Sequence, residues 1–487
     1  MLPEVRLAEL AEAVGGEVIG SDQTPILDVT HDSRQAGPGV LFAAVRGFTS
    51  DGHDFLAQAV ANGASAVCVE ARQDLAVPQL VVADCRAALP RMAATVHHHP
   101  SRRLRVVGVT GTNGKTTVAY LVESIATAAG LRSAVVGTIG ARIAGRPVPV
   151  GRTTPEATDL QRLLARMVEE DVDLAAVEVS SHALALHRVD EVVFAVSAFT
   201  NLTQDHLDFH HNMEDYFRAK ASLFQPGRSD QAVIWVDDPY GSQLAAGLAI
   251  PVTRVGMSLD ADVRAQAIEV TPTGSRFELI VRDGSCRVEL PLGGAFNIEN
   301  ALIAGACAAA LGLTLDDIDR GFRSVAQIPG RFEKIDAGQE FAVIVDYAHT
   351  PEGIAAVVAA ARSVSHGNVI VVIGAGGDRD RLKRPRMGEA ARQADVAIIT
   401  SDNPRSEDPL AIIDELVAGT GKGNGAVQVV PDRRLAIRTA LRMASTDDVV
   451  LILGKGHEQG QEVSGRVQPF DDRVVAGEEL AGLEVAP

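Results

Sequence analysis

Residues 106–117, with the sequence VVGVTGTNGKTT, place an apolar strand directly before a glycine-rich loop that ends in Gly114-Lys115-Thr116. Such a loop lets backbone N–H groups approach phosphate oxygens, and the helix that follows adds positive potential at its N-terminus. Lys115 would then reach the β- and γ-phosphates of ATP, and the Thr116 hydroxyl would ligate Mg²⁺. Residues 117–129 are rich in helix formers and are followed by Gly130, which predicts the required helix. This order of elements predicts an α/β domain that binds ATP.

The loop departs from the usual phosphate-loop pattern at one position. Val109 stands where the pattern has its first glycine, and the earlier glycine is Gly111, three residues before Gly114. We therefore predict a shortened phosphate loop. A glycine turn that carries Lys-Thr by chance is the less favoured interpretation, because both the strand and the helix are present.

Length and charge limit the classes of protein. A chain of 487 residues suggests roughly three domains. The net charge of −18 argues against a nucleic-acid partner, which needs a basic surface. No run of about 18 apolar residues occurs, so we expect no membrane span. The start of the chain is too polar for a signal peptide, and the four cysteines are scattered in apolar runs. We therefore expect a cytoplasmic protein with buried, reduced thiols.

We predict three domains, at residues 1–100, 101–328 and 329–487. Residues 97–103 read as a hydrated linker in which Pro100 stops the preceding helix. The second domain contains a β-rich stretch at 263–290 and a helix at 297–310. The third has four apolar strands, at 343–346, 369–373, 396–400 and 449–453, each followed directly by a polar cluster. A parallel sheet would place all four clusters at one edge, where ligands bind in open α/β folds.

Two polar clusters in the second domain follow apolar strands. Residues 174–178 end in Glu178, and an acid at a strand tip beside a phosphate loop is suited to Mg²⁺, which prefers oxygen ligands. A solvated strand end is the alternative. The cluster at 200–208 includes His206, which could ligate a second cation or orient a carboxylate. A structural role for this histidine is nearly as well supported.

Lys220 is the most unusual residue. Residues 213–224 predict a helix with Asn212 as its N-cap, and the positions three and four residues from Lys220 are all apolar or aromatic (Tyr216, Phe217, Leu223 and Phe224). Burial of this lysine should lower its pKa. The plain alternative is a lysine whose ammonium reaches solvent along its aliphatic stem. A neutral amine could instead react with CO₂ and become a carbamate that binds Mg²⁺.

Together these segments resemble the Mur ligase family in order along essentially the whole chain. The motifs that carry the resemblance are Asp32-Ser33-Arg34, residues 110–117, Glu178-Val179-Ser180-Ser181-His182, Phe199-Thr200-Asn201-Leu202, residues 216–224, Gly294-Ala295-Phe296-Asn297, Pro329-Gly330-Arg331, residues 346–350, Gly376-Gly377-Asp378-Arg379-Asp380, Asp402-Asn403-Pro404-Arg405 and Gly454-Lys455-Gly456-His457-Glu458. The shortened phosphate loop is the form found in this family.

The resemblance implies an α/β protein of three domains: an N-terminal UDP-binding domain, a central phosphate-loop ATPase with a mostly parallel sheet, and a C-terminal Rossmann-like domain that receives an amino acid. The implied enzyme is an ATP-dependent ligase of peptidoglycan precursor synthesis. It would phosphorylate the terminal carboxylate of UDP-N-acetylmuramoyl-L-alanyl-D-glutamate, and the amine of meso-2,6-diaminopimelate would attack the acyl phosphate. ATP, two Mg²⁺ ions and N6-carboxylysine at Lys220 are implied, and we expect a monomer.

The resemblance also implies site residues. The implied catalytic residues are Lys115, Glu178, His206, Lys220 and His349. Thr116, Glu178, His206 and carbamylated Lys220 would hold the metal ions. The nucleotide would contact Gly111, Thr112, Asn113, Gly114, Lys115, Thr116, Thr117, Asn297, Asn300, Arg331 and Asp346. The nucleotide-sugar peptide would contact His31, Ser33, Phe48, Thr49, Ser50, Arg152, Thr153, Thr154, Ser180, Leu186 and Arg188, with Leu186 standing where some members carry glutamine. The amino acid would contact Arg379, Asp402, Asn403, Pro404, Arg405, Gly454 and Glu458.

Three alternatives stay open. A sibling ligase could add L-lysine or L-ornithine or polyglutamylate a folate, but the Asp402-Asn403-Pro404-Arg405 loop is the form associated with meso-diaminopimelate. An ATP-hydrolysing switch would have little use for a third domain with a charged binding edge. A non-enzymatic interaction protein is least favoured, because a phosphate loop would have no evident purpose in it.

Overall fold

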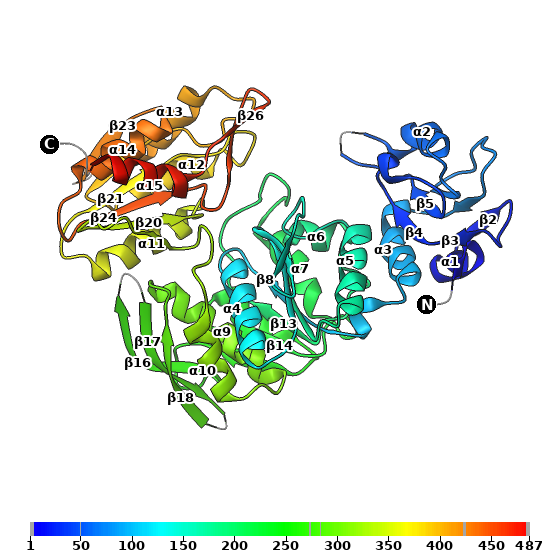
Figure 1. Cartoon of the computed structure of the whole chain (residues 1–487), viewed down its shortest axis with the longest axis horizontal. Helices are drawn as coiled ribbons and strands as arrows, with labels where there is room; N and C mark the ends of the chain where they lie inside the picture. Colours follow the sequence, from blue (N-terminus) through cyan, green and yellow to red (C-terminus); the bar gives the residue numbers. More distant parts are fainter. Residues whose placement is uncertain (1–3, 49, 272–273, 283, 422–424, 484–487) are drawn as a thin grey trace.

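The computed structural model describes residues 4–48, 50–271, 274–282, 284–421 and 425–483. They form three α/β domains, each built on its own sheet, which confirms the predicted fold class. The N-terminal domain (blue) and the C-terminal domain (yellow to red) lie on opposite sides in Figure 1, joined by the central domain. None of the helices in the described part of the chain combines the length and apolar character that crossing a membrane would take.

The N-terminal domain has a five-stranded sheet in the order β2-β7-β6-β5-β4. Its strands from β4 to β7 pair in parallel, and β2 joins β7 antiparallel. The elements are β1 (Val5–Arg6), α1 (Leu7–Val14), β2 (Glu17–Ile19), β3 (Pro25–Ile26), β4 (Asp28–Thr30), β5 (Val40–Ala43), α2 (Leu56–Ala61), β6 (Ala66–Val69), β7 (Gln79–Val81) and α3 (Cys85–Val96).

The junction between the first two domains differs from the predicted hydrated linker. Helix α3 ends at Val96, and Pro100 and Ser101 are buried in a short 3-10 turn (Pro100–Arg102). The Ser101 hydroxyl accepts a hydrogen bond from Val193 N at 3.1 Å. The linker prediction is wrong because this segment packs against the central domain.

The central domain has an eight-stranded sheet in the order β11-β10-β9-β12-β8-β13-β14-β15. It is parallel from β9 to β15, and β10 and β11 extend it antiparallel. The strands are β8 (Arg105–Thr110), β9 (Ser133–Gly137), β10 (Gly140–Ile143), β11 (Arg146–Val148), β12 (Leu174–Glu178), β13 (Val196–Phe199), β14 (Ala232–Trp235) and β15 (Val252–Val255). The helices are α4 (Lys115–Ala128), α5 (Ala157–Glu169), α6 (Ser181–Ala185), α7 (Met213–Ala221), α8 (Pro239–Gly247), α9 (Ala295–Ala310) and α10 (Leu315–Ser324).

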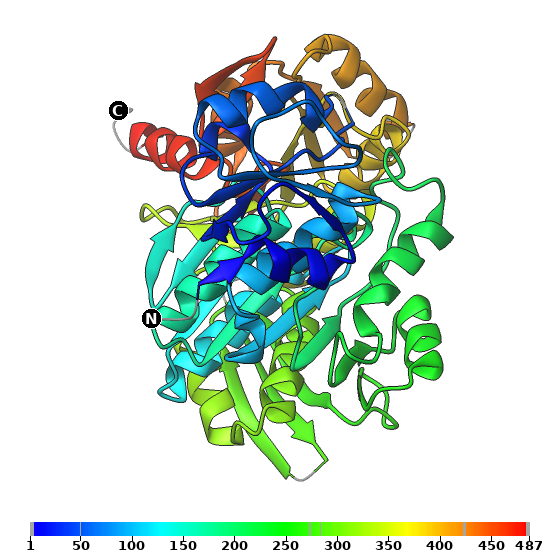
Figure 2. The same ribbon diagram turned by 90° about the vertical axis from the view of Figure 1, so that its right-hand side faces the viewer.

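Local predictions in this domain are largely confirmed. The helix after the phosphate loop is α4, which begins two residues earlier than predicted, and the helix predicted at 297–310 is α9. The β-rich stretch is a separate antiparallel sheet of β16 (Arg264–Thr271), β17 (Gly274–Val281) and β18 (Gly284–Leu290), which projects at the bottom of the molecule in Figure 2. Asn212 caps α7 through Asp215 N at 2.8 Å, but the last predicted turn tightens into a 3-10 helix, Ser222–Phe224.

The C-terminal domain has a six-stranded sheet in the order β19-β20-β24-β21-β22-β23, parallel except for β19. The four predicted strands are confirmed as β20, β21, β22 and β24, so their polar clusters share one edge. The elements are β19 (Glu333–Ile335), β20 (Ala342–Asp346), α11 (Pro351–Val364), β21 (Val369–Ile373), α12 (Lys383–Ala391), β22 (Val396–Ile399), α13 (Pro409–Thr420), β23 (Ala426–Val429), α14 (Arg433–Met443), β24 (Val449–Leu453), β25 (Gly460–Val463), β26 (Arg466–Pro469) and α15 (Asp472–Leu483).

The cysteines carry free thiols. Cys68, Cys85 and Cys307 are buried as predicted. Cys286 is only partly buried, because its strand, β18, is an edge strand of the small antiparallel sheet.

Candidate active site

A cavity of about 670 Å³ opens between the central and C-terminal domains. Its walls come from the phosphate loop, the segments at the carboxyl ends of β12 and β13, and helices α7 and α9 of the central domain. The C-terminal domain adds Arg331, the segment that follows β20, helix α11 and Arg379. All five residues predicted as catalytic line it, namely Lys115, Glu178, His206, Lys220 and His349. So do the predicted nucleotide contacts Thr112, Asn113, Gly114, Thr116, Thr117, Asn297, Asn300, Arg331 and Asp346.

The phosphate loop depends on its glycines. Gly114 has φ of 86°, and a Cβ there would lie 2.3 Å from Asn300 Oδ1. At Gly111 a Cβ would lie 1.8 Å from Thr200 Oγ1. Lys115 curls over the loop, and its Nζ donates to Gly111 O at 2.9 Å and Thr112 O at 2.8 Å. Burial lowers the pKa of Lys115 from its ordinary value.

Glu178 ends β12 and is fully buried, so the solvated strand end is excluded. Its Oε1 accepts from Thr138 N at 2.9 Å, and its Oε2 accepts from the Thr138 hydroxyl at 3.0 Å. The Thr154 hydroxyl donates to the Glu178 backbone oxygen at 2.7 Å. The carboxylate is therefore held at a fixed position in the cavity wall.

Lys220 is 1% exposed, so its ammonium does not reach solvent and the plain alternative is wrong. Its Nζ donates to Gly111 O at 2.7 Å and lies 4.7 Å from the centroid of the Tyr216 ring. Burial lowers the pKa of Lys220 well below its ordinary value, and the nearby charge of Lys115 adds to this shift. The fold thus favours a neutral amine beside the phosphate loop.

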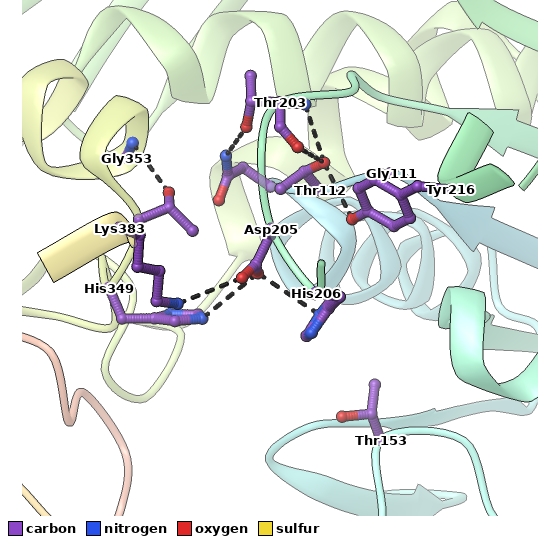
Figure 3. A network of polar contacts seen from close by, with 12 residues as sticks. Gly111, Thr112, Thr153, Thr203, Asp205, His206, Tyr216, His349, Gly353 and Lys383 are labelled. Carbon is purple, nitrogen blue, oxygen red and sulfur yellow. Dashed lines mark hydrogen bonds and ion pairs between the residues drawn. The ribbon is translucent and has the colours of Figure 1, made fainter. Parts of the chain in front are cut away.

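Asp205, which was not predicted as a site residue, joins two domains in this cavity (Figure 3). It is buried, and its carboxylate lies 3.2 Å from Lys383 Nζ and 3.8 Å from His349 Nε2, both from the C-terminal domain. His206 Nε2 lies 3.4 Å away on the central-domain side. Burial lowers the pKa of His206 to about 3 and that of His349 to about 4, so both rings are neutral near pH 7. Burial opposes ionisation of Asp205, but its basic neighbours hold its pKa below the ordinary value.

Arg331 and Asp346 bring the C-terminal domain to the phosphate loop. The Arg331 guanidinium donates to Thr116 Oγ1 at 2.8 Å and lies 4.5 Å from the centroid of the Tyr347 ring. Asp346 accepts from Phe332 N and Ala348 N, each at 2.7 Å, and burial raises its pKa. On the other wall, Asn300 Nδ2 donates to Asn297 Oδ1 at 3.2 Å.

The predicted nucleotide-sugar peptide contacts are only partly brought together. Those that line the cavity are Arg152, Thr153, Thr154, Ser180 and Arg188. Leu186, at the C-terminus of α6, does not line the cavity, and the predicted contacts from the N-terminal domain lie outside it. His31 instead lines a second cavity of about 420 Å³ together with Arg152. The Ser33 hydroxyl donates to Gln58, Phe48 is 79% exposed, Ser50 is exposed, and Thr49 lies outside the described residues.

The predicted amino-acid contacts gather at the carboxyl edge of β22 and β24. Asn403 Nδ2 donates to Glu458 Oε2 at 2.7 Å, and Arg405 donates to Gly377 O at 2.6 Å. Gly377 lies so close to Pro404 that a Cβ would come within 1.9 Å of Pro404 O. Gly454 has φ of 108° beside Asp402. Of this group only Arg379 lines the main cavity.

Comparison with known proteins finds similarity along nearly the whole chain. Three family models match: the Mur ligase family, catalytic domain, at residues 25–107, the Mur ligase middle domain at 109–308, and the Mur ligase, glutamate ligase domain, at 330–456. A protein of Geobacillus thermodenitrificans (strain NG80-2), named UDP-N-acetylmuramoyl-L-alanyl-D-glutamate–2,6-diaminopimelate ligase, is 46% identical over 93% of this chain and 94% of its own length.

Two further relatives bear the same name. One, from Streptomyces coelicolor (strain ATCC BAA-471 / A3(2) / M145), is 46% identical over 97% of this chain and 96% of its own. The other is a solved structure with a TM-score of 0.71 and 32% identity that covers 99% of this chain and 100% of its own. On the identity and coverage of these relatives, the chain belongs to the Mur ligase family.

Proposed function

We propose that this chain is the ATP-dependent ligase that adds meso-2,6-diaminopimelate to UDP-N-acetylmuramoyl-L-alanyl-D-glutamate. The observation that carries the proposal is the single cavity in which the phosphate loop, Glu178, His206 and Lys220 meet Arg331 and His349 of the C-terminal domain. The names of the relatives supply the substrates, and the alignment with them runs over nearly the whole chain. We place the reaction in the cytoplasm, where ATP is available, and a monomer stays a prediction.

In the first step, the γ-phosphoryl group of ATP moves to the terminal carboxylate of the dipeptide, forming an acyl phosphate and ADP. Residues 111–117 hold the phosphates with backbone N–H groups, and Lys115 exchanges its loop carbonyls for phosphate oxygens. Arg331, which bridges to Thr116, neutralises charge from the C-terminal side. Catalysis of such transfers is mainly alignment and charge neutralisation, which this arrangement supplies.

The donor chemistry of the cavity fits Mg²⁺. In the described residues no group of three or more His, Cys, Asp or Glu side chains is arranged to hold a metal by itself. Mg²⁺ is commonly bound by one or two carboxylates together with water and substrate phosphates, so Glu178 and the Thr116 hydroxyl are a suitable partial set for one ion. For the second ion we propose His206 and a carbamate on Lys220, formed when the neutral amine adds CO₂ and releases a proton. When bound, the ions would neutralise phosphate charge.

In the second step, the amine of the amino acid attacks the acyl carbon, loses a proton, and expels phosphate to leave an amide. We propose that Arg379, Asp402, Asn403, Arg405 and Glu458 hold the amino acid at the carboxyl edge of the C-terminal sheet. Arg379 lines the main cavity and suits the far carboxylate of diaminopimelate through bidentate hydrogen bonds. Lysine lacks that carboxylate, so it would not make these hydrogen bonds with Arg379.

The test is phosphate release by the purified protein with ATP, Mg²⁺, UDP-N-acetylmuramoyl-L-alanyl-D-glutamate and one amino acid at a time. We expect release only when meso-diaminopimelate completes the mixture. Equal turnover with L-lysine or L-ornithine would replace the proposal with a sibling ligase. Phosphate release without any amino acid would favour an ATP-hydrolysing switch.

A further inference from the structure

Lys455 is a fully buried cation at the edge of the proposed amino-acid pocket. It follows Gly454 at the carboxyl end of β24, and its side chain is among the largest that are entirely covered. Its Nζ donates to Gly460 O at 2.7 Å, Asn403 Oδ1 at 3.1 Å and Glu458 Oε2 at 3.2 Å. A lysine ammonium has three N–H donors and no acceptor, so these contacts use every proton it carries.

These contacts fix the orientation of Asn403. Because Lys455 only donates, the atom of the Asn403 amide that faces it must be the oxygen. Oδ1 also accepts from Glu462 N at 2.9 Å, which requires the same orientation. The NH₂ group of Asn403 is thereby turned to Glu458, where it donates to Oε2 at 2.7 Å.

The same contacts divide the two oxygens of Glu458. Oε2 receives both Asn403 Nδ2 and Lys455 Nζ. Among the described residues no hydrogen bond or ion pair reaches Oε1, and the Glu458 side chain is 32% exposed. Oε2 is therefore bound by the buried Lys455 ammonium, and Oε1 is free to accept a hydrogen bond from a ligand ammonium.

The backbone around Lys455 packs closely against Asp402 of the amino-acid pocket on one side and against Gly330, at the start of the C-terminal domain, on the other. A Cβ at Gly454 would lie 2.8 Å from Asp402 Oδ2, and a Cβ at Gly456 would lie 2.7 Å from Gly330 O. Both glycines have positive φ, 108° and 53°. The backbone position of Lys455 is thus set by close packing on both sides, as a fixed support for Asn403 and Glu458 requires.

We propose that Lys455 is a positioning residue for the amino-acid substrate. It orients the Asn403 amide and offsets the charge of Glu458, so that one carboxylate oxygen is presented to an ammonium group of the amino acid. This inference rests on the proposed function, and it adds a residue that acts through Asn403 and Glu458 rather than by touching the substrate.

Lys455→Met tests the inference, because methionine fills the space without donating. Initial rates would give the KM for meso-diaminopimelate, for ATP and for the nucleotide-sugar peptide, alongside the thermal midpoint. Loss of hydrogen bonds to a charged pair at an interface can cost 10-fold or more in affinity, so we expect the KM for meso-diaminopimelate to rise at least about 10-fold. The other two KM values should change less than about twofold. Arg438→Met, which removes an ion pair with Glu479 elsewhere in the same domain, is the control and should leave all three KM values unchanged.

The outcomes separate the inference from the function on which it rests. A wild-type protein without amino-acid-dependent phosphate release overturns both. If the wild-type enzyme is active, two results for Lys455→Met overturn the positioning role alone. One is an unchanged KM for meso-diaminopimelate. The other is a rise in all three KM values together with a lower thermal midpoint. If Lys455→Met does not fold, Lys455→Arg keeps the charge and decides the question. For Lys455→Arg, a raised KM confined to meso-diaminopimelate supports the role, and three unchanged KM values refute it.

Discussion

Replacement of Lys220 should change stability and activity in opposite directions. In the structure its ammonium has one hydrogen bond, to Gly111 O, and lies over the face of Tyr216. Lys115 would repel the charged form of Lys220, and Asp205 is the acid that would attract it. A lysine buried here must either lose its proton or hold a poorly compensated charge, and an apolar side chain of similar volume avoids that cost. Such replacements of buried charged groups are often neutral or stabilising by about 1–4 kcal/mol. We therefore expect Lys220→Met to keep or raise the free energy of unfolding.

Activity should respond in the other direction. If the amine carries the proposed carbamate, Lys220→Met removes a group that supports the charge of the transferring phosphoryl group. Loss of one such electrostatic contribution typically costs on the order of 10²–10³-fold in kcat. Lys220→Ala leaves space, and short carboxylic acids added to it should restore part of the rate. Because the amine must be neutral to add CO₂ and its pKa is lowered, the wild-type rate should fall as pH decreases and the amine becomes protonated.

The assay is phosphate release under saturating substrates, with urea unfolding measured on the same preparations. Arg218→Met is a matched control, because Arg218 lies on the same helix, α7, with its side chain exposed. A Lys220→Met enzyme within about tenfold of the wild-type kcat would refute the catalytic role of this residue. A large loss of stability in the same variant would instead refute our view that burial of this lysine costs stability.

Three further predictions follow from the geometry of the cavity. Lys383→Met leaves the Asp205 carboxylate without its ion pair across the two domains, so we expect destabilisation of about 3–5 kcal/mol by urea unfolding, and an unchanged midpoint would contradict this. Gly114→Ala forces a Cβ against Asn300 at a positive φ, which costs about 1–3 kcal/mol in backbone strain, so the affinity for ATP measured by calorimetry should fall. Gly145→Ala is the control, because Gly145 also has a positive φ but faces open space, and this variant should keep the wild-type affinity for ATP. The free energy of unfolding should decrease as pH falls from about 6.5 to about 4, because burial lowers the pKa of His349 and His457 to about 4 and only the unfolded chain binds those protons in that range. The pH slope should be shallower for His457→Gln, and an identical slope would show that this histidine does not contribute.

Features encoded within a short segment could be predicted from the sequence. The strand, loop and helix at residues 106–128, the buried acid at Glu178 and the burial of Lys220 each depend on neighbours within one or two turns of chain. The binding edge of the C-terminal sheet was predictable for a related reason. Four apolar strands followed by polar clusters indicate a parallel sheet, and parallel strands end at the same edge.

Features that depend on how domains pack could not be predicted. Asp205 and Lys383 lie 178 positions apart and meet only because the C-terminal domain docks on the central one. Each belonged to a polar cluster recognised in the sequence, but nothing in either cluster specifies the partner. For the same reason the sequence did not indicate that residues 100–101 would be buried at a junction, or that Ser33 and Phe48 would lie outside the main cavity.

The central claim is that ATP cleavage in the cavity is coupled to formation of an amide with meso-diaminopimelate. Mass spectrometry of the reaction with all substrates tests it most directly, because the mass of the nucleotide-sugar product shows which amino acid was added. We predict one new product, heavier than the nucleotide-sugar dipeptide by one diaminopimelate residue, formed in equal amount to the phosphate released. Phosphate release without that product, or the same yield of a lysine adduct when L-lysine replaces diaminopimelate, would contradict the account.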